Sequence, residues 1–277
     1  MMSASGDFDV EDIPYLEHGT KPLLARLYRP RGPGPFAGVV EVHGGAWTTN
    51  DRLTNSAIHE ALARSGVVVM AIDFRMPPEA KYPASLCDIN FAIRWLKHHA
   101  AEFKVRPDLI GGVGTSSGGH QIMLSALRPR DPRYTALPLP GAATDASLAF
   151  VALCWPINNP FARYRMTKER GLTRLQQAHD AYWANEAEME DGSPTLILER
   201  GEKVSLPPTL LLQGTNDDNV TPDMADAFAA AYRKAGGSIE LHKFEGAPHA
   251  FIARNPAAPA AVKALETIVS FVRRQTS

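Results

Sequence analysis

Short apolar segments rich in β-branched residues alternate along this chain with longer segments of helical periodicity. The clearest apolar runs are Phe36–His43, Val67–Asp73 and Thr209–Gly214, and each is shorter than an average helix. Helical spacing of apolar residues marks Ser56–Ser65 and Pro222–Ala235. Buried strands that alternate with helices indicate a mostly parallel sheet with helices on both faces. The 277 residues are enough for one such α/β domain.

The same criteria assign the remaining elements. Further strands are expected at Leu23–Tyr28, Leu109–Thr115, Leu148–Cys154 and Ile239–Phe244. Further helices are expected at Pro83–Ala101, Ser117–Leu127 and Ala257–Arg273. In the first of these helices the apolar residues that should face the core are Leu86, Ile89, Ile93 and Leu96.

One stretch interrupts the alternation. Residues 156–208 contain no clean strand-and-helix unit, although Thr173–Glu190 has the pattern of an amphipathic helix. We interpret this stretch as an insertion over the sheet, a small cap or lid, with an ordinary surface excursion as the alternative. The polar segment Met1–Asp12 is expected to be a loose leader, so that residues 1–277 form a single domain.

The charges of the chain nearly cancel, with 29 Lys+Arg against 30 Asp+Glu. No basic field exists to attract nucleic acid, and no apolar stretch is long enough for membrane insertion. The N-terminus lacks the pattern of a signal peptide, which predicts a cytoplasmic location. Cys87 and Cys154 lie in apolar stretches and are expected to be buried, although a disulfide stays open. Neither a metal cluster nor a cofactor motif occurs, so no cofactor is expected.

The strongest chemical signal is the segment Gly114–Gly118, a G-x-S-x-G pattern between a predicted strand and a predicted helix. Such a turn is so tight that only small residues fit beside its serine, whose hydroxyl is pushed clear of the sheet. We therefore predict that Ser116 is a nucleophile. Ser117 is the weaker alternative, because it lacks glycines two residues away on each side.

A serine hydroxyl needs a base within hydrogen-bond reach to act as a nucleophile at neutral pH. Of the nine histidines, His249 lies in a loop between a predicted strand and the last helix, where its side chain can reach over the strand ends. His120 lies inside the helix that follows Ser116 and cannot easily turn back. We predict His249 as the general base.

The base needs a carboxylate that fixes its tautomer and stabilises its charged form. Asp217 and Asp218 both lie in a loop at the carboxyl end of a predicted strand, where open α/β sheets place their sites. The order serine, aspartate, histidine along the chain is the one expected for this arrangement. Residue chemistry alone leaves the choice between the two aspartates open.

A tetrahedral intermediate needs backbone N–H donors aimed at its oxyanion, and glycines allow the backbone to approach closely. The segment His43–Trp47 carries two glycines directly after a predicted strand. We assign the N–H of Gly45 to this oxyanion hole, with Gly44 or Ala46 as further candidates. The N–H of Ser117 is expected to be their partner.

Several large side chains are candidates for the walls of a substrate pocket, although core or lid packing is an equal alternative for each. The candidates are Trp47, Trp155, Phe161, Tyr164, Trp183 and Asn219.

With these residues assigned, the chain resembles the α/β-hydrolase superfamily over most of its length. It is most similar to the group of acetylesterases, feruloyl-esterase-like enzymes and the hormone-sensitive-lipase branch. The segment His43–Trp47 resembles the HGG-x-W oxyanion loop of that group, and Asp73–Glu79 resembles its DYRLAPE segment. The pattern Gly214-x-x-Asp217-x-x-Val220 is similar to a superfamily pattern in which the first aspartate is the acid, which favours Asp217. 

The resemblance implies the α/β-hydrolase fold and a serine hydrolase that cleaves carboxylic esters of small to medium acyl chain through an acyl-enzyme. An aryl formamidase or other amidohydrolase with the same triad is the main alternative, since its loop is similar. A non-catalytic binding module on a hydrolase scaffold is a third hypothesis. The expected partner is a small-molecule ester or amide, and a homodimer is one expected assembly, because similar enzymes are often dimers.

Overall fold

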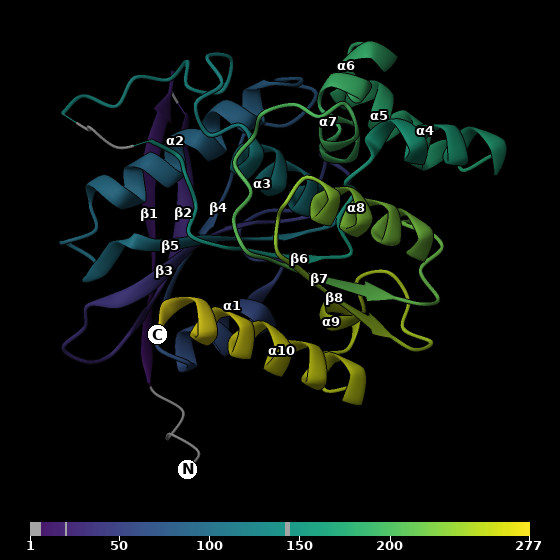
Figure 1. Cartoon of the computed structure of the whole chain (residues 1–277). Coiled ribbons are helices and arrows are strands. Elements are labelled where there is room, and N and C mark those ends of the chain that lie inside the picture. Colours follow the sequence, from purple (N-terminus) through teal and green to yellow (C-terminus); the bar gives the residue numbers. More distant parts are fainter. Residues whose placement is uncertain (1–6, 20, 142–144) are drawn as a thin grey trace.

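The computed structural model describes residues 7–19, 21–141 and 145–277. Eight strands form one sheet in the order β1-β2-β4-β3-β5-β6-β7-β8, and from β4 to β8 every neighbouring pair is parallel (Figure 1). The strands are β1 (Phe8–His18), β2 (Lys21–Pro30), β3 (Phe36–Val42), β4 (Val67–Ile72), β5 (Val105–Thr115), β6 (Val151–Cys154), β7 (Thr209–Gly214) and β8 (Ile239–Phe244). Among these described strands the antiparallel pairs are β1 with β2 and β2 with β4. The predicted α/β class with a mostly parallel central sheet is confirmed.

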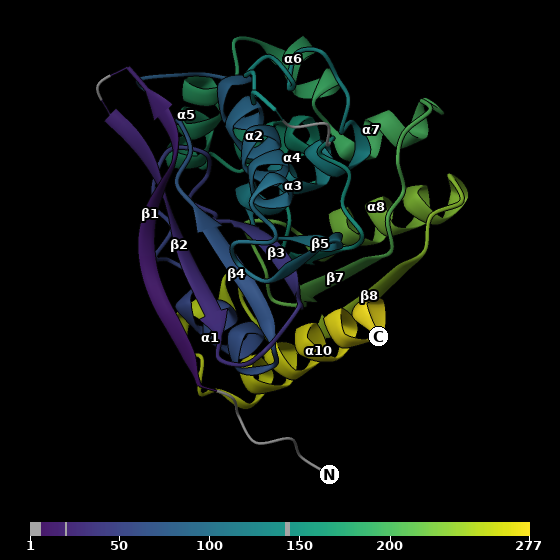
Figure 2. The same cartoon turned by 90° about the vertical axis from the view of Figure 1, so that its left-hand side faces the viewer.

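Helices cover both faces of the sheet (Figure 2). They are α1 (Ser56–Arg64), α2 (Ala84–His98), α3 (Ser117–Leu127), α4 (Pro160–Glu169), α5 (Thr173–Tyr182), α6 (Glu186–Asp191), α7 (Pro194–Glu199), α8 (Pro222–Lys234), α9 (Phe251–Arg254) and α10 (Pro259–Thr276). One hydrophobic core lies beneath α2, α3 and α8, and a second lies beneath α1 and α10. Alternate residues of one strand serve the two cores: Val40 and Val42 face the first core, whereas Val39 faces the second.

Helices α4 to α7 all fall between β6 and β7, the stretch that interrupts the sequence pattern. In Figure 1 these four helices stand beyond the end of the sheet. The prediction of one helix over Thr173–Glu190 is wrong, because α5 ends at Tyr182 and α6 begins at Glu186. Trp183 is extended at the break, and the Asn185 side chain accepts a hydrogen bond from the N–H of Glu188, which starts a new helix.

The prediction of a loose leader over Met1–Asp12 is wrong for residues 8–12, which begin β1; residues 1–6 lie outside the described part of the chain. An edge strand exposes one side to water, so its sequence lacks the apolar run of a buried strand. Its acidic residues pair with arginines of or beside β2. Asp12 Oδ1 lies 2.8 Å from Arg26 Nε, and Asp9 Oδ1 lies 2.7 Å from Arg31 Nη2.

Both cysteines are free and buried. Across the described ranges, no helix has the combined length and apolar character needed to span a bilayer.

Candidate active site

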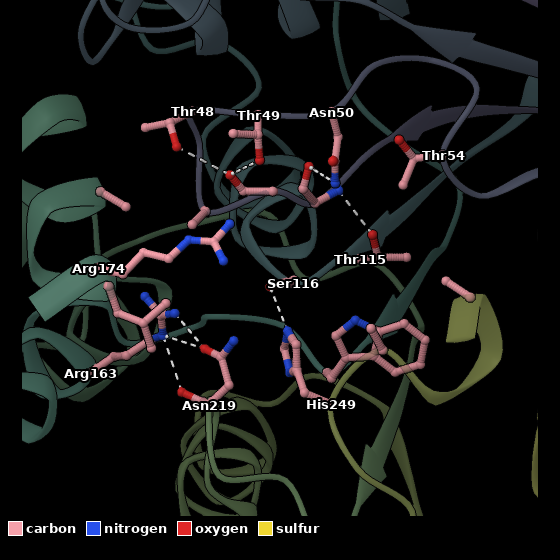
Figure 3. Close-up of a pocket in the computed structure, with 18 of the residues that line it drawn as sticks. Thr48, Thr49, Asn50, Thr54, Thr115, Ser116, Arg163, Arg174, Asn219 and His249 are labelled. Atoms are coloured by element: carbon pink, nitrogen blue, oxygen red, sulfur yellow. Dashed lines mark hydrogen bonds between the residues drawn. The ribbon is translucent and has the colours of Figure 1, made fainter. Parts of the chain in front are cut away.

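Ser116 occupies the sharp turn between β5 and α3. Its backbone has φ 51° and ψ −118°, a strained conformation for a residue with a side chain. The turn requires glycine on both sides, because a Cβ on Gly118 would lie 2.0 Å from the Val42 carbonyl oxygen and one on Gly114 would lie 2.7 Å from that of Gly118. The serine side chain is thereby presented to a pocket at the carboxyl ends of the strands (Figure 3).

Three side chains from distant parts of the chain form a hydrogen-bonded row (Figure 3 shows its first link). His249 Nε2 lies 3.0 Å from Ser116 Oγ, and His249 Nδ1 lies 2.8 Å from Asp217 Oδ2. Asp217 follows β7, and His249 lies between β8 and α9, so both sit in loops at the same sheet edge as Ser116. All three residues are buried or nearly so, which strengthens each electrostatic contact in the row.

The neighbours of Asp217 fix its carboxylate. Oδ1 accepts the N–H groups of Asn219 at 2.9 Å and Val220 at 2.8 Å, and Oδ2 accepts the Gln213 amide at 3.1 Å. The adjacent Asp218 is exposed, and His249 Nδ1 is paired with Asp217 Oδ2 instead. Of the two aspartates that residue chemistry left open, the structure brings Asp217 to the histidine.

The loop after β3 turns the N–H of Gly45 away from its neighbours. The carbonyl oxygen of Gly44 accepts hydrogen bonds from His43 Nδ1 at 2.7 Å and Asn50 Nδ2 at 3.3 Å. In a trans peptide the following N–H points opposite to the carbonyl. Since Gly45 lines the same pocket as Ser116, its amide is placed to act as a donor there.

The next peptide is held in the same way. The carbonyl oxygen of Gly45 accepts the N–H groups of Thr48 and Thr49, both at 3.1 Å, which directs the N–H of Ala46 to the other side. Position 45 needs glycine, because its φ is 119° and a Cβ would lie 2.1 Å from the Thr49 carbonyl oxygen. Ala46 itself has a positive φ of 51°.

The structure engages Gly44 elsewhere, contrary to the prediction that it is a free donor. Its N–H donates to Thr115 Oγ1 at 3.0 Å. A Cβ at this position would lie 3.1 Å from Ser116 Cβ, so the glycine permits close approach of the two loops. Ser117 remains with the predicted set, because it is the first residue of α3 and its N–H has no partner within the helix.

Beneath the serine lies a buried polar network that the sequence analysis missed. Glu41 Oε2 lies 2.9 Å from His59 Nε2, and Glu41 Oε1 accepts the Asn55 amide at 2.7 Å. Asn55 also donates to Thr115 Oγ1 at 3.1 Å, the same hydroxyl that accepts the N–H of Gly44. Glu41 and His59 are fully buried. The available signal was one carboxylate in the middle of the apolar run Phe36–His43.

A cavity of about 650 Å³ opens above Ser116. Its walls include Trp155 and Asn219, two of the predicted pocket residues. The Trp155 ring meets the His249 ring edge-on, with centroids 6.2 Å apart, and therefore limits the positions the imidazole can take.

The other four predicted pocket residues do not line this cavity. Trp47 is buried and stacks on Tyr182 with ring centroids 5.3 Å apart, and Trp183 packs edge-on against the same indole at 6.0 Å. Tyr164 donates its hydroxyl proton to Asp180 outside the cavity, and Phe161 lines a different surface hollow. Trp47 and Trp183 instead fill the junction between the α4–α7 segment and the rest of the molecule, because large apolar surfaces gain most from complete burial.

Two buried histidines near Trp47 have no carboxylate partner among the described residues. His120 accepts from Trp47 Nε1 at 3.2 Å and lies 2.8 Å from the Gly192 carbonyl oxygen. Burial lowers the pKa of His120 to about 4. Burial and the neighbouring Arg163 charge lower the pKa of His179 to about 2. Both imidazoles are therefore neutral at pH 7.

A known protein family matches most of this chain. The sequence matches the profile of the alpha/beta hydrolase fold family over residues 39–253, most of its length. The chain belongs to this family. The matched part of this alpha/beta hydrolase includes Ser116, Asp217 and His249.

Curated relatives of this alpha/beta hydrolase include two proteins of Mycobacterium tuberculosis. The esterase LipQ is 28% identical over 252 residues, which cover 87% of this chain and 56% of LipQ. The carboxylic ester hydrolase LipN is 28% identical over 239 residues, which cover 83% of this chain and 61% of LipN. The chain thus spans little more than half the length of these relatives.

Solved structures match nearly the whole alpha/beta hydrolase chain. Esterase 2 of Thermogutta terrifontis, with propionate bound, superposes with a TM-score of 0.76 at 25% identity, covering 98% of this chain and 94% of that chain. The metagenomic carboxylesterase EstE1 superposes with a TM-score of 0.80 at 23% identity, covering 100% and 92%. At 23% identity, the likeness to EstE1 shows a shared fold and nothing more.

Proposed function

We propose that this protein is a serine hydrolase that cleaves carboxylic esters of small to medium acyl chain. The observation that carries the proposal is the hydrogen-bonded row from Ser116 Oγ through His249 to Asp217. A hydroxyl, an imidazole and a buried carboxylate in this order form the catalytic triad that activates a serine for attack on a carbonyl.

Each member of the triad has its own task. Ser116 Oγ attacks the ester carbonyl carbon while His249 Nε2 accepts the hydroxyl proton. The same imidazole then donates that proton to the leaving alcohol, and the acyl group stays on Ser116. Water, deprotonated by His249, attacks this acyl-enzyme and releases the acid. Asp217, fixed by two backbone N–H groups, holds the imidazole tautomer and stabilises its cation.

Backbone N–H donors stabilise the negative charge of the tetrahedral intermediate. We assign the oxyanion hole to the N–H groups of Gly45, Ala46 and Ser117, which surround Ser116. The hydrogen bonds that hold the carbonyl oxygens of Gly44 and Gly45 fix these donors before substrate arrives. One such donor is worth about 3 kcal/mol of the activation barrier.

The relatives support ester hydrolysis and a short acyl group. LipQ and LipN carry the names of ester hydrolases. Esterase 2 of Thermogutta terrifontis has been solved with propionate and with butyrate bound.

The test is turnover of 4-nitrophenyl esters from acetate to octanoate beside N-formylkynurenine, for the wild type and Ser116→Ala. We expect turnover of the shorter esters and a loss of about 10⁴-fold or more in the variant. Faster turnover of the formamide than of any ester would assign an aryl formamidase instead. Absence of turnover by folded wild-type protein would favour a binding module.

A further inference from the structure

The cavity above Ser116 has a cationic wall. Three arginines contribute to its lining: Arg163 on α4, Arg174 on α5 and Arg254 at the end of α9. Among the described residues that line it, none is an aspartate or a glutamate. A neutral alkyl ester does not account for this imbalance, because an alkyl chain offers a guanidinium neither an opposite charge nor a hydrogen-bond acceptor.

Arg163 is a fully buried cation with no carboxylate of its own. Its guanidinium donates to the carbonyl oxygen and side-chain oxygen of Asn219 and to His179 Nε2. These are neutral acceptors, and no ion pair of Arg163 occurs within the described ranges. A guanidinium has five N–H donors, so these three acceptor atoms do not saturate it. Burial lowers the pKa of Arg163 to about 10, and the group stays charged at pH 7.

Arg174 is the second cation, and it is exposed on the cavity side of α5. In Figure 3 its side chain extends into the pocket toward Ser116, between Thr48 and Thr49 on one side and Arg163 on the other. Within the described part of the chain it has neither an ion pair nor a side-chain hydrogen bond. It also lies in the first turn of α5, where a cation opposes the helix dipole and no acidic residue offsets it. The helix therefore gains nothing from this charge.

We infer that the preferred substrates are esters that carry a negatively charged group, a carboxylate in the first instance, which binds the exposed Arg174 in front of the buried charge of Arg163 while the ester carbonyl lies at Ser116. The inference rests on the proposed function and adds a substrate class to it. A guanidinium fork matches the two oxygens of a carboxylate, and such charge-assisted pairs are shorter and stronger than neutral hydrogen bonds. The anionic group is a recognition element and takes no part in the bond changes, in which ester and water give acid and alcohol.

The test uses two pairs of esters that differ in charge but hardly in shape. Monoethyl adipate against ethyl hexanoate places the carboxylate on the acyl side. The anion of 4-acetoxybenzoic acid against its methyl ester places it on the alcohol side. The readout is the ratio of kcat/KM for the anionic ester to that for the neutral ester, so that a general loss of activity cancels.

We expect a ratio of about ten or more in one of the two pairs, the gain of one charge-assisted hydrogen bond. Arg174→Gln should reduce that ratio at least fivefold, mostly through KM. The matched control is Arg170→Gln, which removes one exposed positive charge near the end of α4 but outside the cavity lining, and should keep the ratio. Added salt should lower the wild-type ratio, because Arg174 is exposed.

Ratios near or below one in both pairs would overturn the inference, as would equal ratios in wild type and Arg174→Gln. Either result leaves the proposed function intact if the neutral esters are hydrolysed by Ser116. Failure of the wild type to hydrolyse any of the four esters would instead count against the proposed function.

Discussion

Two buried carboxylate–histidine pairs are linked to the turn that carries Ser116, and only one of these two contacts the serine hydroxyl directly. In the first, Asp217 Oδ2 lies 2.8 Å from His249 Nδ1, and the other imidazole nitrogen lies 3.0 Å from the serine hydroxyl. In the second, Glu41 Oε2 lies 2.9 Å from His59 Nε2, at nearly the same separation. The second imidazole nitrogen of His59 has no hydrogen-bond partner among the described residues.

The position of such a carboxylate–histidine pair decides whether it takes part in catalysis or in stability. His249 belongs to a loop at the strand ends and lines the same cavity as the serine that it contacts. His59 lies on α1 with its ring 5.2 Å from that of Tyr28, inside the core beneath the sheet. Among the described residues, its pair is linked to the site through Asn55 and Thr115, and it therefore supports the turn that carries Ser116. We expect the first pair to govern turnover and the second to govern stability.

The largest effect should follow Asp217→Asn. An amide cannot stabilise the imidazolium and favours the wrong tautomer, so kcat should fall about 10⁴-fold. Asp218→Asn is the matched control, because the neighbouring carboxylate is exposed and is not the one paired with His249. Steady-state kinetics on one 4-nitrophenyl ester compares the two. Equal losses in both variants would show that the first pair is not the one that acts.

Glu41→Gln should lower the stability of the fold strongly and the turnover only weakly. Breaking a buried pair leaves His59 with a poorer partner, so the free energy of unfolding should fall by about 2 to 4 kcal/mol, whereas kcat should fall less than tenfold. Urea unfolding and kinetics measure both quantities. Glu60→Gln, the same change at an exposed ion pair with Arg64, should cost about 0.5 kcal/mol or less. A loss of kcat as large as that of Asp217→Asn would show that the Glu41–His59 pair governs turnover as well.

The smallest effect concerns His120, a buried histidine that has no carboxylate partner among the described residues. Its folded pKa of about 4 lies below the unfolded value of 6.5, so the unfolded state binds more protons between these pH values. Stability is therefore fully present above pH 6.5 and is lost as the pH falls toward 4. His120→Gln should lower the slope of unfolding free energy against pH by about 1.4 kcal/mol per pH unit in that window. Identical slopes would refute a neutral buried His120.

Much of the fold follows from local pattern. The strand β4 consists of six apolar residues and is buried throughout, so its sequence predicts it directly. The edge strand β1 escapes prediction, because its stability comes from pairing with β2 and from ion pairs such as Asp12–Arg26. The break between α5 and α6 escapes as well, since the extended Trp183 serves packing against Trp47 rather than helix propensity.

The residues of the site also differ in whether the sequence predicts them. The residues of the triad could be chosen from the turn and loop context of Ser116, Asp217 and His249, because the fold places such loops at one sheet edge. The cavity walls could not be predicted from the sequence. The packing of α4–α7 over the sheet determines which aromatic rings face the cavity. The arginines escaped for a simpler reason: charged residues in an amphipathic stretch are usually solvated, and only the structure shows Arg163 to be buried.

Activation of the Ser116 hydroxyl by His249 can be measured by covalent labelling with a fluorophosphonate. We expect one label per folded chain, mapped by mass spectrometry to Ser116, absent in Ser116→Ala and slowed by orders of magnitude in His249→Ala. A label on Ser117, or folded wild-type protein that takes up no label, would show that His249 does not activate Ser116.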